Sequence, residues 1–197
     1  MDIETNKFDK IRRQIEFYFS DPNIRHDKFF RKKLMEYRYL HDFGIPISII
    51  SKFNKIVELD ASVQDVINSL SSSKVVYVNI ETLTIHRFKP IDVDLFGIVP
   101  YDQMLFIKGI PKKWDHNNVK SLLGRFGKVS VVKLPKINKS NIRRHYGFVE
   151  METPQQAKNA IENYKEVFPF SKIMVLPWSN WVSKKNAFRE KSRRNST

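Results

Sequence analysis

Apolar segments in the second half of the chain follow one another in an order that restricts the fold strongly. Short runs rich in β-branched and aromatic residues, typical of buried strands, are MLFIKGI, KVSVVKL, HYGFVEM and KIMVL. A helical pattern that begins near Trp114 lies between the first two runs, and another begins at Pro154, behind the capping residues Thr153 and Gln156. The order strand, helix, strand, strand, helix, strand therefore predicts an α+β domain.

The third of these runs also carries aromatic residues in a specific spacing. RHYGFVEM, residues 144–151, agrees with the RNA recognition motif pattern K/R-G-F/Y-G/A-F-V-x-F/Y at Arg144, Tyr146, Gly147, Phe148 and Val149, whereas His145 and Met151 depart from it. The element order is the ferredoxin-like βαββαβ plan of that motif. Alternation along a strand places Tyr146 and Phe148 on one face, where Phe106 could join them. Unpaired bases could stack on this face, unless the tail or the other domain covers it.

The first half of the chain predicts several small helices and then two short strands. Helical spacing occurs at 7–19, 27–37, 47–53 and 62–70, and the last of these opens with Ser62 and Asp65, a relative of the capping box. Residues 75–88, VVYVNIETLTIHRF, predict two strands around a turn. Helices followed by a β-hairpin are typical of a winged-helix domain. The stretch 20–23, Ser-Asp-Pro-Asn, is expected to be a polar break after the first helix.

Three aromatic residues follow one another at the end of the first predicted helix. Consecutive helical side chains point about 100° apart, so Phe17, Tyr18 and Phe19 spread over roughly 200° and cannot all face one core. At least one of them is expected to point elsewhere. Phe19, Ile15 and Phe30 are expected to be core residues.

Residues 89–103 contain two prolines and no sustained periodicity, which is typical of a linker. We therefore predict four segments. They are a winged-helix domain at 1–89, a linker at 90–103, an RNA recognition motif at 104–182 and a basic C-terminal extension at 183–197, which is either solvated or helical.

Charge and residue usage narrow the class of partner. The chain has 35 Lys and Arg against 21 Asp and Glu, a net charge of +14, which favours a polyanion: nucleic acid first, although an anionic membrane surface would also attract it. The absence of cysteine excludes disulfides and thiolate metal sites. The first residues, MDIETNKF, lack the apolar run of a signal peptide, and no run is long enough to span a membrane. We therefore expect a nuclear or cytosolic protein.

The most specific pattern in the sequence is QIEFYFSDPNIRHDKFF, residues 14–30, followed by SIISKFNKI. It closely resembles the La motif of La and La-related proteins, and a La motif joined to an RNA recognition motif is the La module of that family. The resemblance runs from about Lys7 to Trp181. It implies that the protein captures the 3′ end of an RNA that finishes in uridines and localises to the nucleus.

The resemblance also implies which residues bind the terminal nucleotides. They are Gln14, Phe17, Tyr18, Asp27, Phe29, Phe53 and, in the second domain, Val132. Gln14 would hydrogen-bond a uracil edge, and Asp27 would accept from the 2′ and 3′ hydroxyls of the last ribose. A carboxylate at this position favours binding of an RNA whose last ribose has free hydroxyls, and it repels a terminal phosphate. Because Asp27 stands in a polar turn that opens a helix, we expect it to contribute little to stability. At Phe17, authentic La proteins usually have tyrosine.

The segment after the fourth strand, KIMVLPWSNWVSKK, looks like group seven of the La-related proteins, which chaperone one noncoding RNA, the 7SK small nuclear RNA or a telomerase RNA, within a ribonucleoprotein. The expected function is therefore protection of the uridine-rich, free-hydroxyl 3′ end of such an RNA, with protein subunits of the particle as further partners. The alternative within the family is an authentic La-type chaperone of RNA polymerase III transcripts such as pre-tRNA. Additional RNA-binding residues are expected at Phe106, Tyr146, Phe148, Lys184, Lys185 and Arg189.

Other classes of function fit less well. The five histidines form no HxH or HExxH pattern, and neither a phosphate-binding glycine loop nor a nucleophile elbow is found, so we expect no catalytic residue, no metal and no cofactor. A winged-helix protein that binds duplex DNA could use Lys52, Lys55, His86, Arg87 and Lys89. A protein-interaction module with aromatic anchors is the third alternative.

Overall fold

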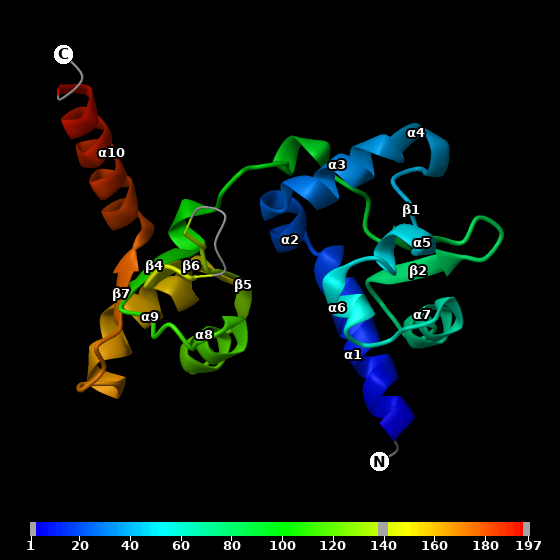
Figure 1. The fold of residues 1–197 in the computed structure, drawn as a ribbon, viewed down its shortest axis with the longest axis horizontal. Coiled ribbons are helices and arrows are strands. Elements are labelled where there is room, and N and C mark those ends of the chain that lie inside the picture. The colour runs from blue at the N-terminus through cyan, green and yellow to red at the C-terminus, as the bar shows by residue number, and fades with distance from the viewer. Residues whose placement is uncertain (1–2, 138–141, 195–197) are drawn as a thin grey trace. The chain divides into compact units, whose positions relative to one another are not determined.

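The computed structural model describes residues 3–137 and 142–194 (Figure 1). The chain divides into two compact units, Met1–Ile98 (unit 1) and Val99–Thr197 (unit 2), each with a hydrophobic core of its own. Within the described residues, no helix is both long enough and apolar enough to cross a membrane.

Unit 1 consists of short helices and a small antiparallel sheet of strand order β1-β3-β2. Its elements are α1 (Ile3–Tyr18), α2 (Asp21–His26), α3 (Lys28–Glu36), α4 (Arg38–His41), β1 (Ile45–Pro46), α5 (Ile47–Ile50), α6 (Asn54–Val57), α7 (Val63–Leu70), β2 (Val76–Asn79), β3 (Thr84–Arg87) and the 3₁₀ turn η1 (Val93–Leu95). The helices precede the β2–β3 hairpin, as predicted for a winged helix.

The core of unit 1 is built on one face of α1. Ile11, Ile15 and Phe19 are spaced four residues apart and are completely buried, and Phe30 and Leu34 of α3 are buried with them. The prediction that Ile15, Phe19 and Phe30 belong to the core is therefore confirmed. Because burying such a side chain contributes about 1.5–3 kcal/mol, this face fixes the direction in which α1 presents its remaining side chains.

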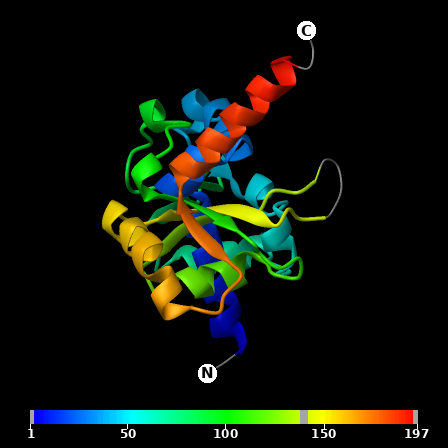
Figure 2. The ribbon, with the colours of Figure 1, turned by 90° about the vertical axis from the view of Figure 1, so that its left-hand side faces the viewer.

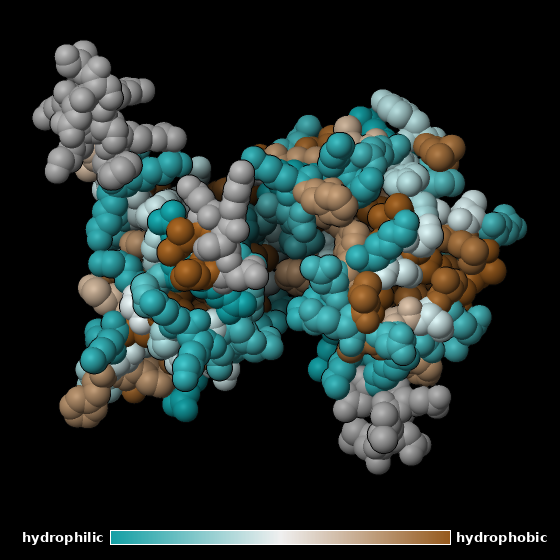
Figure 3. Space-filling view, viewed as in Figure 1, coloured by the Kyte–Doolittle hydropathy of each residue, from teal (hydrophilic) through white to brown (hydrophobic). Residues whose placement is uncertain are grey.

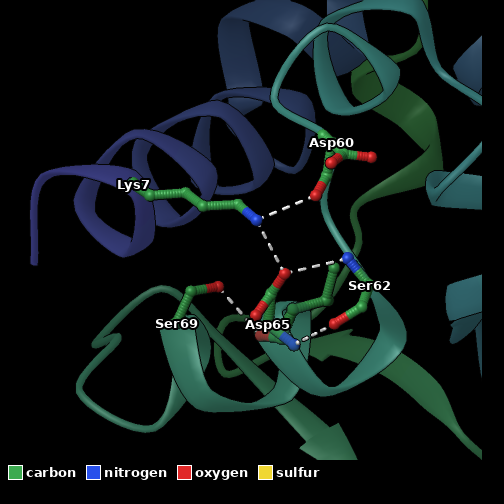
Figure 4. A network of polar contacts seen from close by, with 6 residues as sticks. Lys7, Asp60, Ser62, Asp65 and Ser69 are labelled. Carbon is green, nitrogen blue, oxygen red and sulfur yellow. Dashed lines mark hydrogen bonds and ion pairs between the residues drawn. The ribbon is translucent and has the colours of Figure 1, made fainter. Parts of the chain in front are cut away.

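A polar network joins α1 to the start of α7 (Figure 4). The Lys7 ammonium group donates to the Asp60 carbonyl oxygen at 2.8 Å and to Asp65 Oδ2 at 2.9 Å. Asp65 Oδ2 also accepts from the Ser62 N–H at 3.0 Å, and Ser62 Oγ accepts from the Asp65 N–H at 3.1 Å. The predicted capping relation at Ser62 is thus confirmed as a reciprocal capping box.

The stretch expected to be a polar break separates α1 from α2 and also contains the start of α2. Ser20 caps this helix, with its hydroxyl oxygen accepting from the Asn23 N–H at 3.3 Å, and Pro22 stands in the first turn, where it needs no hydrogen-bond donor. The prediction that the first helix ends here is confirmed, because α1 ends at Tyr18. Residues 21–23 are helical and not a break, because serine and proline signal a helix start as readily as a turn. The adjacent helices α1, α2 and α3 follow one another with only one or two residues between them.

Part of the predicted linker packs on unit 1. Ile91 and Phe96 are partly buried against the core of this unit, and the boundary between the units falls after Ile98.

Unit 2 has an antiparallel sheet of strand order β5-β6-β4-β7, which is the ferredoxin-like order. Its elements are η2 (Tyr101–Gln103), β4 (Met104–Lys108), α8 (His116–Leu123), β5 (Val129–Lys133), β6 (Tyr146–Met151), α9 (Pro154–Val167), β7 (Met174–Pro177) and α10 (Trp178–Arg194). The predicted α+β fold class is confirmed.

The two faces of this sheet have different coverings. Leu105, Ile107 and Val149 point toward α8 and α9 and form the core of unit 2 with them. Phe106 pairs directly with Phe148 across β4 and β6, on the other face. Helix α10 continues directly from the end of β7 (Figure 2), and this is the element that covers the second face.

Candidate nucleic-acid interface

The three consecutive aromatic residues at the end of α1 have three different environments. Phe19 lies in the core, Tyr18 is half-buried, and Phe17 is 37% exposed. The ring centroids of Phe17 and Tyr18 lie 6.3 Å apart. The prediction that not all three face the core is confirmed, and the helix delivers two rings to the surface of unit 1.

Two further rings from α3 and the start of α6 complete an aromatic cluster, defined here as Phe17, Tyr18, Phe29 and Phe53. The Phe53 ring lies 5.0 Å from that of Tyr18 and 5.8 Å from that of Phe29, in edge-to-face arrangements. Phe29 is exposed, and the Lys33 ammonium group stands 5.7 Å from its centroid. Such partly exposed rings beside a cation can stack bases without regard to their identity.

Asp27 stands between α2 and α3 and caps α3. Its Oδ1 accepts from the N–H groups of Phe29 at 2.9 Å and Phe30 at 3.0 Å, whereas Oδ2 takes part in neither bond. An N-cap of this kind contributes about 1 kcal/mol, so from the cap we now expect Asp27 to contribute to stability, in contrast to the expectation from the sequence. The cap also fixes the carboxylate beside the exposed Phe29.

The Tyr18 hydroxyl brings the polar residues of the motif together. Burial raises the pKa of this hydroxyl to about 12, a side-chain hydrogen bond with Gln14 opposes the rise, and the carboxylates of Glu58 and Asp27 add to it. Gln14 and Asp27 therefore both act on Tyr18, although Gln14 lies on α1 and Asp27 stands between α2 and α3. At neutral pH the hydroxyl stays protonated and can donate a hydrogen bond.

On unit 2, α10 covers the aromatic face of the sheet. Phe106 is only 2% exposed, because the ring of Trp181 lies 5.5 Å from it and also 5.1 Å from Tyr146 and 5.2 Å from Phe148. Trp178 packs against Phe148 at 5.0 Å. The aromatic face is covered, as one of the alternatives had it, but by Trp178 and Trp181 at the start of α10 and not by the basic extension 183–197. A base could reach Phe106 only if α10 moved.

The spacing of two tryptophans in the sequence is a signal for this cover. Trp178 and Trp181 are three residues apart, so on a helix they share one face, opposite a strand face that carried three aromatic residues. The Nε1 atom of Trp178 is buried without a hydrogen-bond partner among the described residues.

The remaining predicted RNA-binding residues are dispersed. Val132 on β5 packs partly buried against the core of unit 2, and its role in RNA binding stays a prediction. Lys184 and Lys185 are exposed on α10, and the pKa of Lys184 is lowered because its ammonium group lies beside that of Lys108. The Arg189 side chain lies outside the described residues, as do residues 138–141 of the basic loop, which is residues 136–144 between β5 and β6.

Several basic residues considered for duplex binding are engaged within unit 1. Arg87 Nη2 and Lys89 Nζ bind the two carboxylate oxygens of Asp21, at 2.6 and 2.7 Å, and Lys55 pairs with Glu58 at 2.6 Å. The pKa of Asp21 is lowered: burial would raise it, and the hydrogen bonds from Lys89 and Arg87 outweigh burial. These pairs weaken the case for a duplex-binding wing. Nor does the part of the chain that the structure describes hold a group of three or more acidic or histidine side chains that could bind a metal ion.

Comparisons with known proteins agree with this architecture. The model of the La domain matches residues 11–72, and that of the RNA recognition motif matches residues 105–172. La-related protein 7 from Mus musculus is 31% identical over 155 residues, which are 77% of this chain and 26% of that protein. The Danio rerio protein of the same name is 28% identical over 155 residues, again 77% of this chain and 26% of the relative.

A more distant relative extends over a larger share of the chain, and a solved structure matches about half of it. Lupus La protein homolog A from Xenopus laevis is 26% identical over 183 residues, 90% of this chain and 42% of that protein. The solved La autoantigen N-terminal domain is 23% identical, with a TM-score of 0.41 over 47% of this chain and 97% of its own. The chain spans about a quarter of the length of the La-related protein 7 relatives it matches.

Proposed function

We propose that this chain, which belongs to the family of La and La-related proteins and binds RNA, captures the uridine-rich 3′ end of a noncoding RNA that carries a free hydroxyl. The observation that carries the proposal is the aromatic cluster with the Asp27 carboxylate fixed beside it. Four partly exposed rings stand next to an acid whose second oxygen is not used by the helix cap.

Each group has a suitable task in such a site. Stacking on an aromatic ring contributes about 1–3 kcal/mol per base, so the cluster would hold the last nucleotides. Gln14 would select uracil, because its amide offers both a donor and an acceptor to the base edge. Asp27 Oδ2 would accept from the ribose hydroxyls, and its charge would repel a 3′ phosphate.

We further propose that the protein remains on this RNA in the nucleus, as part of a ribonucleoprotein of the 7SK or telomerase type. The similarity to La-related protein 7 supports this over transient binding to polymerase III transcripts such as pre-tRNA. Crosslinking in cells, with sequencing of the bound RNAs and their 3′ ends, separates the two: one abundant mature RNA supports the proposal, and a spread of precursor tRNAs supports the alternative.

The site itself is tested with Asp27→Asn. Asparagine caps helices as well as aspartate, so this substitution keeps α3 intact and removes only the charge. We expect oligouridylate with a free 3′ hydroxyl to bind about tenfold or more weakly, as for a charged hydrogen bond lost, and the preference over the 3′-phosphorylated RNA to shrink. Fluorescence anisotropy measures both.

A matched control is Asp115→Asn, which makes the same change at the N-cap of α8 in unit 2, where Asp115 accepts from the Asn118 N–H at 3.0 Å. It should leave both affinities unchanged. A folded Asp27→Asn protein that still discriminates the two RNA ends as the wild type does would remove Asp27 from the site. A duplex-binding protein would ignore the 3′ end altogether.

A further inference from the structure

A hollow in unit 1 is lined by the β2–β3 hairpin and by the turn at Asp42 and Phe43, and it shares no residue with the aromatic cluster. Its volume is about 320 Å³, which is at the lower end of the range of small-molecule sites and sufficient for one nucleotide base. We call it the wing hollow; its walls include Phe43, Tyr77, His86, Arg87, Phe88 and Lys89.

The walls of the wing hollow are aromatic where a hairpin normally faces solvent with polar residues. Tyr77 on β2 pairs with His86 on β3, and their rings are stacked at 5.2 Å with an interplanar angle of 16°. The Phe88 ring lies 5.1 Å from that of Tyr77. Tyr77 is 40% and Phe88 59% exposed, so these rings are not required to fill the core.

Charged groups stand at the edge of the same hollow. Arg87 and Lys89 share the single carboxylate of Asp21, and the carboxylate of Asp42 also lies in the lining, so the formal charges of these four side chains cancel. The Lys89 side chain is nevertheless 67% exposed, so its ammonium group can reach a phosphate. The Nε atom of Arg87 is buried with no hydrogen-bond partner among the described residues. Asp42, also in the lining, supplies an acceptor for a base edge or a ribose hydroxyl.

The backbone that forms one wall is strained. Asp42 and Phe43 have φ values of 44° and 61°, in the left-handed region that a bulky residue such as phenylalanine rarely adopts. Gly44 follows, and a Cβ atom there would lie 2.3 Å from the His86 ring. The turn is therefore held against the hairpin in a strained backbone conformation. Strained residues of this kind are found more often at binding sites than at ordinary turns.

We propose that the wing hollow is a second RNA subsite that takes one unpaired nucleotide from the body of the RNA. The base stacks on Tyr77 and Phe88, and a neighbouring phosphate lies at Lys89. Stacked rings beside the exposed ammonium group of Lys89, on a chain of net charge +14, favour RNA over an apolar protein segment. The inference rests on RNA binding by the chain and does not depend on capture of the 3′ end.

An apolar surface continues from the same ridge. Tyr77 and Phe88 also line a neighbouring hollow of about 280 Å³ with Ile67 and Ile80. Apolar residues gather on the side of unit 1 where the hairpin lies (Figure 3). The walls of this neighbouring hollow are mostly aliphatic and carry no cation, so we do not include it in the subsite. Such a surface would also suit a protein partner, and the experiment has to distinguish a protein partner from RNA.

The test compares two RNAs: a 20-nucleotide single strand ending in four uridines, and the four-nucleotide oligouridylate alone. Tyr77→Ala and Phe88→Ala should each weaken binding of the long RNA about five- to tenfold, the lower part of the effect of one stacked base. Binding of the short RNA should not change. Phe88→Leu keeps the apolar bulk and removes only the aromatic ring, so it should weaken the long RNA as well.

Tyr39→Ala is the matched control, because Tyr39 is 90% exposed on α4 and the Arg38 guanidinium lies 5.2 Å from its ring, outside the wing hollow. It should bind both RNAs as the wild type does. In addition, 4-thiouridine placed inside the long RNA should crosslink to a peptide containing Tyr77 or Phe88, and 4-thiouridine at the 3′ end should not.

Two results would overturn the proposal. In the first, all three variants are folded and bind the long RNA with wild-type affinity, and 4-thiouridine inside that RNA does not crosslink to the hairpin. The other is the loss of a protein partner from these variants while RNA affinity is retained. The 3′ capture is read separately, from the short RNA and its 3′-phosphorylated form, so either assignment can fail without the other.

Discussion

The ring of Trp181 on α10 lies 5.5 Å from the ring of Phe106 on β4, so the C-terminal helix occupies the place where an RNA recognition motif stacks its bases. The pattern on the third strand is therefore present while its usual surface is covered. In this conformation, RNA contacts of unit 2 have to come from the rim of the sheet, the basic loop or α10 itself.

Removing this cover should expose a binding surface. Trp181→Ala deletes contacts with three rings, and because Trp181 is only partly buried we expect unit 2 to lose about 2 kcal/mol of unfolding free energy, less than for a core tryptophan. Binding of oligocytidylate with a 3′ phosphate, which cannot use the 3′-end site, should rise severalfold because Phe106 becomes accessible. Calorimetry and anisotropy measure the two effects.

Val182→Ala is the control, since Val182 is exposed on the next position of α10. If the Trp181 variant unfolds at the wild-type temperature and binds oligocytidylate no better, the helix does not close the sheet in solution.

A second prediction separates the two tasks of Asp27. Asp27→Ala removes an oxygen that accepts two backbone N–H groups at the start of α3, so it should lower the free energy of unfolding by about 1 kcal/mol. Asp27→Asn keeps the cap and should stay within a few tenths of the wild type. Thermal unfolding of unit 1 compares them. Equal stability of all three proteins would mean that the cap is not formed.

The sequence predicted most of what local patterns determine. The capping box at Ser62, the buried positions of α1 and the strands of unit 2 depend on residues close together in the chain, so periodicity and capping signals were sufficient. Strand β1 could not be found, because Ile45 and Pro46 form no periodic pattern and become a strand only by pairing with Ile85 and Thr84.

The candidate site divides in the same way. The specific residues around Tyr18 were identified from the motif, and a helix was predicted from Asp27 onward. That the Asp27 carboxylate accepts from the backbone N–H groups of Phe29 and Phe30 is given only by the structure. The cover over Phe106 depends on its contact with Trp181, about 75 residues further along the chain. The ion pair between Asp21 and Arg87 likewise joins residues about 65 positions apart. Such contacts are decided by tertiary packing.

A third prediction concerns acid. The pKa of Asp21 in the folded chain is lowered below its ordinary value of 3.8, despite burial, by the hydrogen bonds from Lys89 and Arg87. A carboxylate whose pKa is lower in the folded than in the unfolded chain stabilises the fold at pH values above its pKa in the unfolded chain. This contribution is lost as the pH falls through its pKa in the folded chain. The difference in melting temperature between wild type and Asp21→Asn should thus be larger at pH 6 than at pH 2.5.

Asp92→Asn is a suitable control for the acid experiment, because Asp92 is exposed and caps only the short turn η1. A melting difference for Asp21→Asn that is the same at both pH values would contradict the charge-assisted role of this carboxylate.

The last prediction separates affinity from end recognition. Lys184 lies beside Lys108, and Lys185 follows it on the exposed part of α10, so these ammonium groups form a place where a phosphate would relieve the repulsion between like charges. Replacing Lys184 and Lys185 by alanine should weaken binding and flatten the slope of log affinity against log salt by about 0.7 for each single-strand phosphate contact removed. The preference for a uridine end over a cytidine end should remain.

Gln14→Ala should reduce the preference for a uridine end and leave the salt slope nearly unchanged. A neutral amide releases no counterion, but it can hydrogen-bond a base edge. Lys158→Ala on α9, where Lys158 lies 3.9 Å from Glu162, controls for the general loss of a positive charge and should change neither quantity. Anisotropy titrations of both RNA ends across a salt series give the slope and the preference from one set of measurements. A tail variant that loses the uridine preference, or a Gln14 variant that keeps it in full, would show that end recognition and phosphate binding are assigned to the wrong residues.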